Sequence, residues 1–133
     1  MSGTRVILVI DDDPGIRFVL RKALERAGYV VHEAGDGQVG LQRFRELQPD
    51  LVITDIIMPE REGVETIVAL RREVPSMPII AMSGGGGGGA DYLAMAEKLG
   101  AARTLHKPFS LAEALEAVDE VLAAKEREES RLP

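Results

Sequence analysis

Five short runs of β-forming residues alternate with amphipathic helical patterns, and this alternation limits the fold more than any other feature of the chain. The predicted strands are residues 5–10, 29–34, 51–54, 78–82 and 102–105, and the predicted helices are residues 14–27, 38–47, 63–73, 90–99 and 110–124. Strict alternation is typical of βαβ units with a parallel sheet. Because crossovers between parallel strands are right-handed, we expect an α/β fold with five helices on both faces of a five-stranded parallel sheet.

The predicted helices each show one apolar stripe. In the first, Asp13 and Pro14 are typical of an N-cap followed by proline at the first helical position. The last begins with Ser110, and Glu113 completes a capping box. The apolar side chains at helical spacing are Ile16, Val19, Leu20, Ala23, Leu24 and Ala27 in the first helix, Val39, Leu41, Phe44 and Leu47 in the second, Ile67 and Leu70 in the third, and Leu111, Leu115, Val118 and Leu122 in the last. We expect these residues to face the core.

Polar side chains stand at the carboxyl ends of four predicted strands. Asp11 and Asp12 follow the first strand, Asp55 the third, Ser83 the fourth and Lys107 the fifth. In open parallel sheets, ligands bind at the carboxyl ends of the strands, near the point where the strand order reverses. The fold therefore brings these five residues to one edge of the sheet.

Three neighbouring carboxylates repel one another, and a divalent cation relieves that repulsion. Oxygen ligands of this kind suit Mg²⁺, which binds a few carboxylates together with waters and phosphate oxygens. An aspartate such as Asp55 is able to take a phosphoryl group as an acyl phosphate. The ammonium of Lys107 and the hydroxyl of Ser83 are suited to the phosphoryl oxygens. Each acid taken alone is also compatible with a solvated loop residue, because loops are rich in aspartate.

Four short motifs carry a resemblance to a known family, the receiver domains of two-component response regulators. They are Ile10-Asp11-Asp12-Asp13-Pro14, then Thr54-Asp55-Ile56-Ile57-Met58-Pro59 with Gly63, then Met82-Ser83-Gly84, and finally His106-Lys107-Pro108-Phe109. Each is weak alone, but in this order and strand context they are specific together. The match extends from Val6 to about Ala124.

The resemblance implies a flavodoxin-like, doubly wound sheet with strand order 2-1-3-4-5. It also implies that Asp55 accepts a phosphoryl group from a sensor histidine kinase or a histidine phosphotransfer protein. Asp11, Asp12, Asp55 and the backbone carbonyl of Ile57 would bind Mg²⁺. Ser83 and Lys107 would sense the phosphoryl oxygens, with a cis Lys107-Pro108 bond. Receiver domains are classed as signalling modules rather than as enzymes.

The same resemblance leads us to expect a receiver domain over residues 1–124 and a charged tail over 125–133 that frays, because the tail lacks apolar periodicity. Receivers commonly meet partners through the fourth helix, fifth strand and fifth helix. That surface would include Tyr92, Met95, Arg103, Glu113, Glu116 and Asp119. A homodimer through this surface is one expectation, although most charged helical faces are simply solvated.

Composition excludes several other classes of protein. The chain has 133 residues, the size of one domain, and a formal net charge of -6, which argues against a nucleic-acid-binding surface. It has no cysteine, so disulfides and thiolate metal sites are excluded. Its apolar runs are shorter than the roughly 20 residues of a membrane helix, and the N-terminus does not resemble a signal peptide. We therefore expect a cytoplasmic protein.

Two positions depart from the family pattern. Family members often carry an aromatic residue three positions before the lysine, where this chain has Thr104, and this puts aromatic-based switching in doubt. Six glycines fill positions 84–89. Ordering them costs on the order of 10 kcal/mol of backbone entropy, so we expect a mobile loop. It is either an inert spacer or a segment that decouples Ser83 from the fourth helix.

Three alternatives remain open on sequence alone. Asp11 and Asp13 satisfy the D-x-D spacing of haloacid-dehalogenase-type phosphatases, although Pro14 follows and the chain is too short for a cap domain. A flavodoxin-like cofactor binder would need aromatic rings, and the chain has two Tyr, three Phe and no Trp. A degenerate receiver that binds a partner without phosphate is disfavoured by the complete set of acids.

Overall fold

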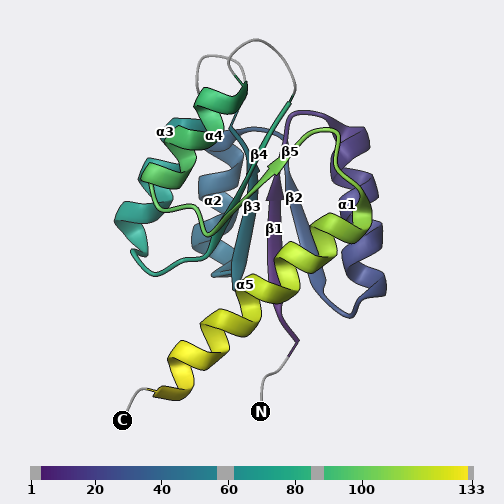
Figure 1. Cartoon of the computed structure of the whole chain (residues 1–133), viewed down its shortest axis with the longest axis vertical. Helices are drawn as coiled ribbons and strands as arrows, with labels where there is room; N and C mark the ends of the chain where they lie inside the picture. The colour runs from purple at the N-terminus through teal and green to yellow at the C-terminus, as the bar shows by residue number, and fades with distance from the viewer. Residues whose placement is uncertain (1–3, 57–61, 85–88, 132–133) are drawn as a thin grey trace.

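The computed structural model of this chain describes residues 4–56, 62–84 and 89–131, which form a parallel sheet between two layers of helices (Figure 1). The strands are β1 (Val6–Ile10), β2 (Val30–Ala34), β3 (Leu51–Asp55), β4 (Ile79–Ser83) and β5 (Arg103–His106). The helices are α1 (Pro14–Arg26), α2 (Gly37–Leu47), α3 (Glu62–Glu73), α4 (Gly89–Lys98) and α5 (Leu111–Arg131). Strands and helices alternate as expected, with boundaries that differ by at most one residue except at the end of α5.

The sheet has the strand order β2-β1-β3-β4-β5, and its neighbouring strands are parallel. This confirms the predicted order. The order reverses at β1, whose last residue, Ile10, lies between Ala34 of β2 and Thr54 of β3. The carboxyl ends of β1 and β3 are therefore adjacent, and the segments that leave them begin at the same edge.

Two apolar cores lie on the two faces of the sheet. Side chains alternate along β1, so Ile7 and Val9 join the core under α1 and α5, whereas Leu8 and Ile10 join the core on the opposite face. In Figure 1, α1 and α5 cover one face, and α2, α3 and α4 cover the other. Strands buried on both faces explain why the predicted strand segments are almost continuously apolar.

Helix α2 packs against β1 through a glycine. A Cβ atom on Gly40 would lie 2.6 Å from Cδ1 of Ile10, so only glycine permits this separation. Phe44 is buried as predicted, but Val39 is 37% exposed, so its predicted core position is wrong. The periodicity placed Val39 inward, whereas the structure gives that place to its neighbour Gly40.

Three further apolar side chains predicted for the core lie on the surface, and one of them is Ala27, which follows α1. Val19 of α1 is 46% exposed and Leu111 at the start of α5 is 41% exposed. Both line a depression of about 640 Å³ between α1 and the segment that joins β5 to α5. A helical stripe identifies an apolar face, but neighbouring elements decide how much of that face they cover.

The last helix continues beyond the predicted boundary at residue 124 and ends at Arg131. The expectation that the charged segment frays is therefore wrong for residues 125–131. Arg5 donates from Nη2 to Oε1 of Glu126 at 2.7 Å and from Nη1 to Oδ1 of Asp50 at 3.3 Å. Glu, Lys and Arg are also good helix formers, so propensity and ion pairs both extend α5 without an apolar stripe. Among the described helices, none has the length and apolar character needed to cross a bilayer.

Candidate functional site

Asp11 lies at the carboxyl edge of the sheet, immediately after β1, and is fully buried. Its backbone N–H donates to the carbonyl of Ala34 at 3.1 Å, which continues the ladder between β1 and β2 by one bond. Its Oδ1 accepts a hydrogen bond of 2.9 Å from the backbone N–H of Asp13. Asp13 in turn caps α1 by accepting from the N–H of Gly15 at 2.8 Å. The start of α1 therefore holds the Asp11 carboxylate in place.

Asp12 and Asp55 complete a cluster of three carboxylates. Asp55 is the last residue of β3 and is 4% exposed, whereas Asp12 is exposed. One carboxylate oxygen from each of Asp11, Asp12 and Asp55 lies within 4.8 Å of the others. The predicted convergence of these three acids is present. Their spacing and all-oxygen donor set fit a hard divalent cation such as Mg²⁺.

Lys107 lies between two of these carboxylates. Its Nζ donates to Oδ2 of Asp11 at 2.7 Å and to Oδ2 of Asp55 at 3.1 Å. It follows the last residue of β5, and its peptide bond to Pro108 is cis, as the resemblance implied. The Lys107 backbone N–H also donates to the carbonyl of Ser83 at 2.7 Å, so the predicted lysine and serine are held next to each other.

Burial and charge act against each other in this cluster. Burial raises the pKa of Asp11, and the hydrogen bonds from Lys107 and Asp13 oppose that shift only in part. Burial lowers the pKa of Lys107, but the hydrogen bond to Asp11 and the charges of both aspartates outweigh it and raise the pKa above its usual value. The surroundings therefore favour the charged form of the Lys107 ammonium, whereas they disfavour the charged form of the buried Asp11 carboxylate.

Ser83 and Thr104 lie on the two strands next to the cluster. Ser83 ends β4 and is fully buried, and its Oγ donates to the carbonyl of Gly84 at 3.4 Å. Thr104 pairs with Ala81 in the sheet and is partly buried. Side chains alternate along β5, so Thr104 faces away from Leu105, toward the side that α4 covers.

Arg17 also contacts the site, and the sequence did not predict this contact. Its Nη1 donates to the backbone carbonyl of Asp11 at 2.6 Å, and its Nε donates to Oε1 of Glu33 at 3.0 Å. A basic residue on an exposed helix usually reaches into solvent, so its position in α1 gave no signal of this contact. The structure alone identifies it.

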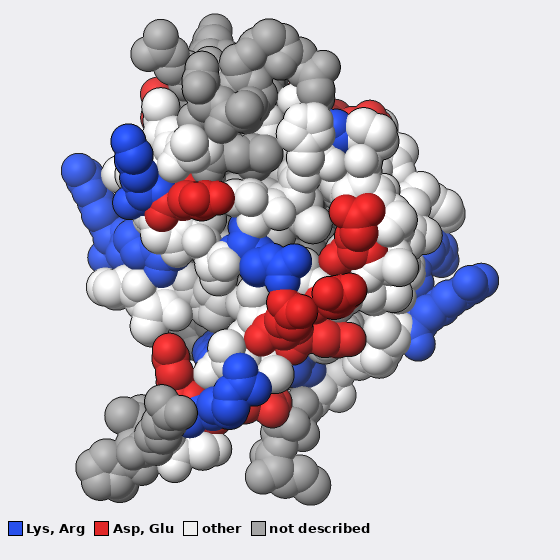
Figure 2. All heavy atoms as spheres, viewed as in Figure 1, with Lys and Arg blue, Asp and Glu red and all other residues white. Residues whose placement is uncertain are grey.

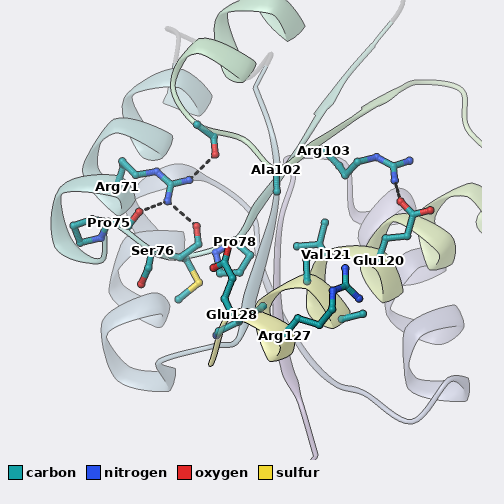
Figure 3. Close-up of a pocket in the computed structure, with 15 residues that line it drawn as sticks. Arg71, Pro75, Ser76, Pro78, Ala102, Arg103, Glu120, Val121, Arg127 and Glu128 are labelled. Atoms are coloured by element: carbon teal, nitrogen blue, oxygen red, sulfur yellow. Dashed lines mark hydrogen bonds and ion pairs between the residues drawn. The ribbon is translucent and has the colours of Figure 1, made fainter. Parts of the chain in front are cut away.

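A second depression, of about 580 Å³, lies at the amino ends of β4 and β5, remote from the aspartates (Figure 3). Arg71 donates there to the carbonyls of Pro75 at 2.7 Å, Met77 at 2.8 Å and Gly100 at 2.9 Å. Burial lowers the pKa of Arg71. These contacts make Arg71 a clamp between the loops that precede β4 and β5.

Two expectations lie outside the described residues. The carbonyl of Ile57 belongs to the segment 57–61, and most of the predicted glycine loop belongs to the segment 85–88. At the borders of the latter, Gly84 follows β4 and Gly89 begins α4.

The sequence matches curated proteins over most of its length. It is 38% identical over 126 residues to the DNA-binding transcriptional regulator NtrC of Bradyrhizobium sp., a match that covers 91% of this chain and 25% of that protein. It is 34% identical over 116 residues to the chemotaxis protein CheY of Thermotoga maritima, covering 86% of this chain and 95% of that one. The chain thus spans about a quarter of the NtrC relative and nearly all of the CheY relative.

Solved structures give the same result. A CheY-like receiver domain protein from Methanospirillum hungatei superposes with a TM-score of 0.87 at 28% identity, covering 95% of this chain and 99% of that one. A receiver domain protein from Clostridium thermocellum superposes with a TM-score of 0.85 at 31% identity, covering 92% and 97%. The family model of the response regulator receiver domain matches residues 7–119. Sequence, fold and the cluster of acids agree, and the chain belongs to the response regulator receiver domain family.

Proposed function

We propose that this chain accepts a phosphoryl group on Asp55 from a phosphohistidine, in a reaction that depends on Mg²⁺. The observation that carries the proposal is the convergence of Asp55 with Asp11 and Asp12, whose oxygens lie within 4.8 Å of one another, together with Lys107 at 3.1 Å from Asp55. Phosphoryl transfer requires positioning and neutralisation of the phosphoryl oxygens more than covalent help from the protein. This cluster supports both requirements.

In the proposed reaction, a carboxylate oxygen of Asp55 attacks phosphorus, the phosphorus–nitrogen bond of the donor breaks, and imidazole leaves. Asp55 is the last residue of β3, so the hydrogen-bonded backbone of the sheet fixes its position. The next residue, Ile56, donates its N–H to the carbonyl of Met82 at 2.9 Å, so the strand pairing extends past the nucleophile. Asp55 is thereby held against β4 while the donor approaches.

Asp11 and Asp12, with Asp55, are the described side chains that would hold Mg²⁺, and the Ile57 carbonyl is a further proposed ligand. The bound ion would neutralise charge on the phosphoryl group. The raised pKa of the buried Asp11 supports a cation here, because its carboxylate is under-compensated by Lys107 and the Asp13 N–H alone. We propose these roles for Asp11, Asp12 and Asp55 as a set.

Lys107 and Ser83 are the proposed readers of the product. Lys107 already donates to Asp55, so its ammonium is placed to follow an oxygen added at that carboxylate. Ser83 is tied to Lys107 through the 2.7 Å hydrogen bond between their backbones. A shift of either residue on phosphorylation therefore moves the end of β4, and with it the start of the segment that leads to α4. Thr104 cannot fill the space of an aromatic ring, so we propose that the relay in this chain does not depend on an aromatic side chain.

A partner surface adjoins the proposed phosphorylation site. The depression between α1 and the start of α5 is lined by Lys107 and by the apolar side chains of Val19 and Leu111. Phe18, on the same helix, is 57% exposed, with Nζ of Lys22 lying 5.5 Å from its ring centroid. Exposed apolar patches of this kind mark sites of protein contact. We propose that the protein carrying the phosphohistidine docks here.

Labelling with acetyl phosphate and Mg²⁺ tests the chemistry. We expect wild type and Asp13→Asn to take up one phosphoryl group, measured by intact mass, and Asp55→Asn to take up none. Asp13→Asn is a matched control, because asparagine caps a helix as well as aspartate does. A dehalogenase-type phosphatase predicts the reverse, with label retained in Asp55→Asn and lost in Asp11→Asn. Failure of beryllofluoride to bind in the presence of Mg²⁺ would support a receiver that works without phosphate.

The docking surface has its own test. Val19→Glu should slow phosphotransfer from a purified sensor histidine kinase and leave labelling by acetyl phosphate unchanged, because only the kinase needs the apolar face. Equal loss in both assays would contradict this surface. Profiling against a panel of such kinases would identify the cognate donor.

A receiver unit over residues 1–124 and a homodimer through α4, β5 and α5 remain proposals. Figure 2 shows acidic side chains gathered over α5 on this face. In a symmetric dimer these like charges would approach one another unless they pair with basic residues such as Arg103, which already pairs with Glu120. We therefore expect any self-association to strengthen with salt, as measured by sedimentation velocity at low and high ionic strength.

A further inference from the structure

Arg17 connects α1 to the backbone of the segment that carries Asp11 and Asp12. Its Nη1 donates to the carbonyl oxygen of Asp11 at 2.6 Å, a short bond from a charged donor. The Arg17 side chain is only 20% exposed. That carbonyl belongs to the peptide unit that joins Asp11 to Asp12. The guanidinium therefore restrains the orientation of this peptide rather than a side chain.

The two acids depend differently on this restraint. Asp11 is buried and has three further hydrogen bonds: its N–H donates to Ala34, and its carboxylate accepts from the Asp13 N–H and from Lys107. Asp12 is exposed, and the peptide held by Arg17 sets the position of its Cα and the direction in which its side chain leaves the backbone. Rotation of that peptide would move the Asp12 carboxylate away from those of Asp11 and Asp55.

Glu33 of β2 orients Arg17. Its Oε1 accepts from Nε of Arg17 at 3.0 Å, and its Oε2 accepts from Nη1 of Arg21 at 3.2 Å. The carboxylate also neutralises a cation that would otherwise stand beside the proposed metal site. Arg21 lies one helical turn further along α1, and it also pairs with Glu25. Arg21 thus shares the partner Glu33 with Arg17, whereas the described bond to the Asp11 carbonyl is made by Arg17.

We propose that Arg17 is a positioning residue for divalent-cation binding, because it fixes the Asp11–Asp12 peptide so that both carboxylates face the same ion. The inference rests on the proposed function, since it presumes that the three aspartates hold Mg²⁺. Substitution of a group that orients the ligands of a metal without touching the metal commonly weakens metal binding by about 10–100-fold.

The sign of the effect separates positioning from simple charge. Removing a cation near a metal site lowers the repulsion on Mg²⁺, so charge alone predicts tighter binding when Arg17 is neutralised. Loss of the restraint on the Asp11–Asp12 peptide predicts weaker binding. A single substitution therefore discriminates between the two effects.

Titration calorimetry with MgCl₂ on unphosphorylated protein tests the proposal. Arg17→Met should weaken Mg²⁺ binding by about tenfold. Arg21→Met, the matched control, removes the same charge from the same helix and should leave the affinity unchanged or slightly higher. Unchanged or tighter binding in Arg17→Met would overturn the proposal. An equal loss in Arg21→Met would overturn it as well, because the effect would then belong to the ion pairs between α1 and β2.

Two further variants keep the test decisive. Arg17→Lys retains the charge but lacks the planar guanidinium that reaches Glu33 and Asp11 together, so it should also weaken binding. If Arg17→Met does not fold, as judged by urea denaturation without Mg²⁺, wild-type affinity in Arg17→Lys would overturn the proposal.

Asp12→Asn separates failure of the proposed metal site from failure of the proposed role of Arg17. If wild type does not bind Mg²⁺, or Asp12→Asn binds it equally well, the metal site of the proposed function fails. If Asp12→Asn loses binding and the Arg17 variants do not, only the role of Arg17 fails.

Discussion

Charged side chains gather at both ends of the sheet, but the two groups are balanced in different ways. At the amino end, Arg5 is paired with Asp50 at 3.3 Å and with Glu126 at 2.7 Å, and Lys125 approaches Asp50 at 3.8 Å. At the carboxyl end, the ammonium of Lys107 pairs with Asp11 and Asp55, two of the three clustered carboxylates. The first group is close to neutral, and the second has an excess of negative charge.

The amino end of the sheet is arranged for stability, whereas the carboxyl end carries the proposed chemistry. The amino-end pairs join β1, the start of β3 and α5 and involve partly exposed groups that need no further ligand. Burial, with a smaller contribution from the charge of Asp55, raises the pKa of Asp11, so the charged form of this carboxylate is disfavoured in the folded protein. Functional sites commonly retain unfavourable electrostatics of this kind.

The largest expected effect comes from removing Lys107, the cation that pairs with Asp11 and Asp55. Lys107→Met would remove the cation that pairs with the buried carboxylate of Asp11, which would then face the carboxylate of Asp55. This change should lower the free energy of unfolding by about 3 kcal/mol without Mg²⁺. Added Mg²⁺ should restore part of this loss, because the ion replaces the missing charge. Urea denaturation with and without MgCl₂ measures both. An equal loss in both conditions would show that the lysine does not balance these acids.

At the amino end, Arg5→Met should lower the free energy of unfolding by about 2 kcal/mol, since it removes charged hydrogen bonds to Asp50 and Glu126. The loss should be the same with and without Mg²⁺, and calorimetry should give wild-type Mg²⁺ affinity. A change in Mg²⁺ affinity would mean that the two ends of the sheet are coupled, and would contradict the separation of their roles.

Removing the metal should affect only the carboxyl end. At a free Mg²⁺ concentration about ten times its dissociation constant, binding should stabilise wild type by about 1.4 kcal/mol relative to protein in EDTA. Asp12→Asn should lose most of this gain, whereas Asp50→Asn should keep it despite its lower overall stability. A thermal-denaturation series over Mg²⁺ concentration gives these differences, and a full gain in Asp12→Asn would contradict the assignment.

The smallest effect is expected at Tyr29, which precedes β2 and donates its hydroxyl proton to Oδ1 of Asp119 on α5. Burial and the Asp119 carboxylate raise the pKa of Tyr29 to about 12. Because this value exceeds the usual pKa of about 10, the contribution is complete below that pH and is lost as pH rises toward 12.

We therefore expect Tyr29→Phe to lose about 0.5 kcal/mol at neutral pH. Its unfolding free energy should also fall less steeply than that of wild type above pH 10. Parallel curves for the two proteins over that range would contradict the hydrogen bond to Asp119.

Residue patterns predicted the fold and the main acids because both depend on local features of the chain. Continuous apolar runs identify doubly buried strands, and parallel strands bring Asp11, Asp55 and Lys107 to one edge whatever the details of packing. The convergence of these residues is confirmed by the distances between them. Their chemical roles remain proposals.

Other features depend on contacts between distant segments, and patterns did not reveal them. Arg17 reaches a backbone carbonyl, which any sequence supplies, so no partner residue marks the contact. The extension of α5 relies on Arg5, which lies 121 positions before Glu126. Val19 is exposed although it lies on the apolar stripe of α1, and it lines the depression between α1 and the start of α5.

The bond between Arg5 and Glu126 also bears on the order of events during folding. It closes a loop of 121 residues, and closing a flexible loop of that length costs on the order of 4 kcal/mol of chain entropy. We expect such contacts to form after the local βα units have assembled and to be absent from the folding transition state. We therefore expect Arg5→Met to accelerate unfolding and to leave the refolding rate nearly unchanged, as seen in the two arms of a chevron plot. A slower refolding arm would place the contact in the nucleus instead. With an unchanged refolding arm, the bond between Arg5 and Glu126 governs how long the folded domain persists rather than how quickly it forms.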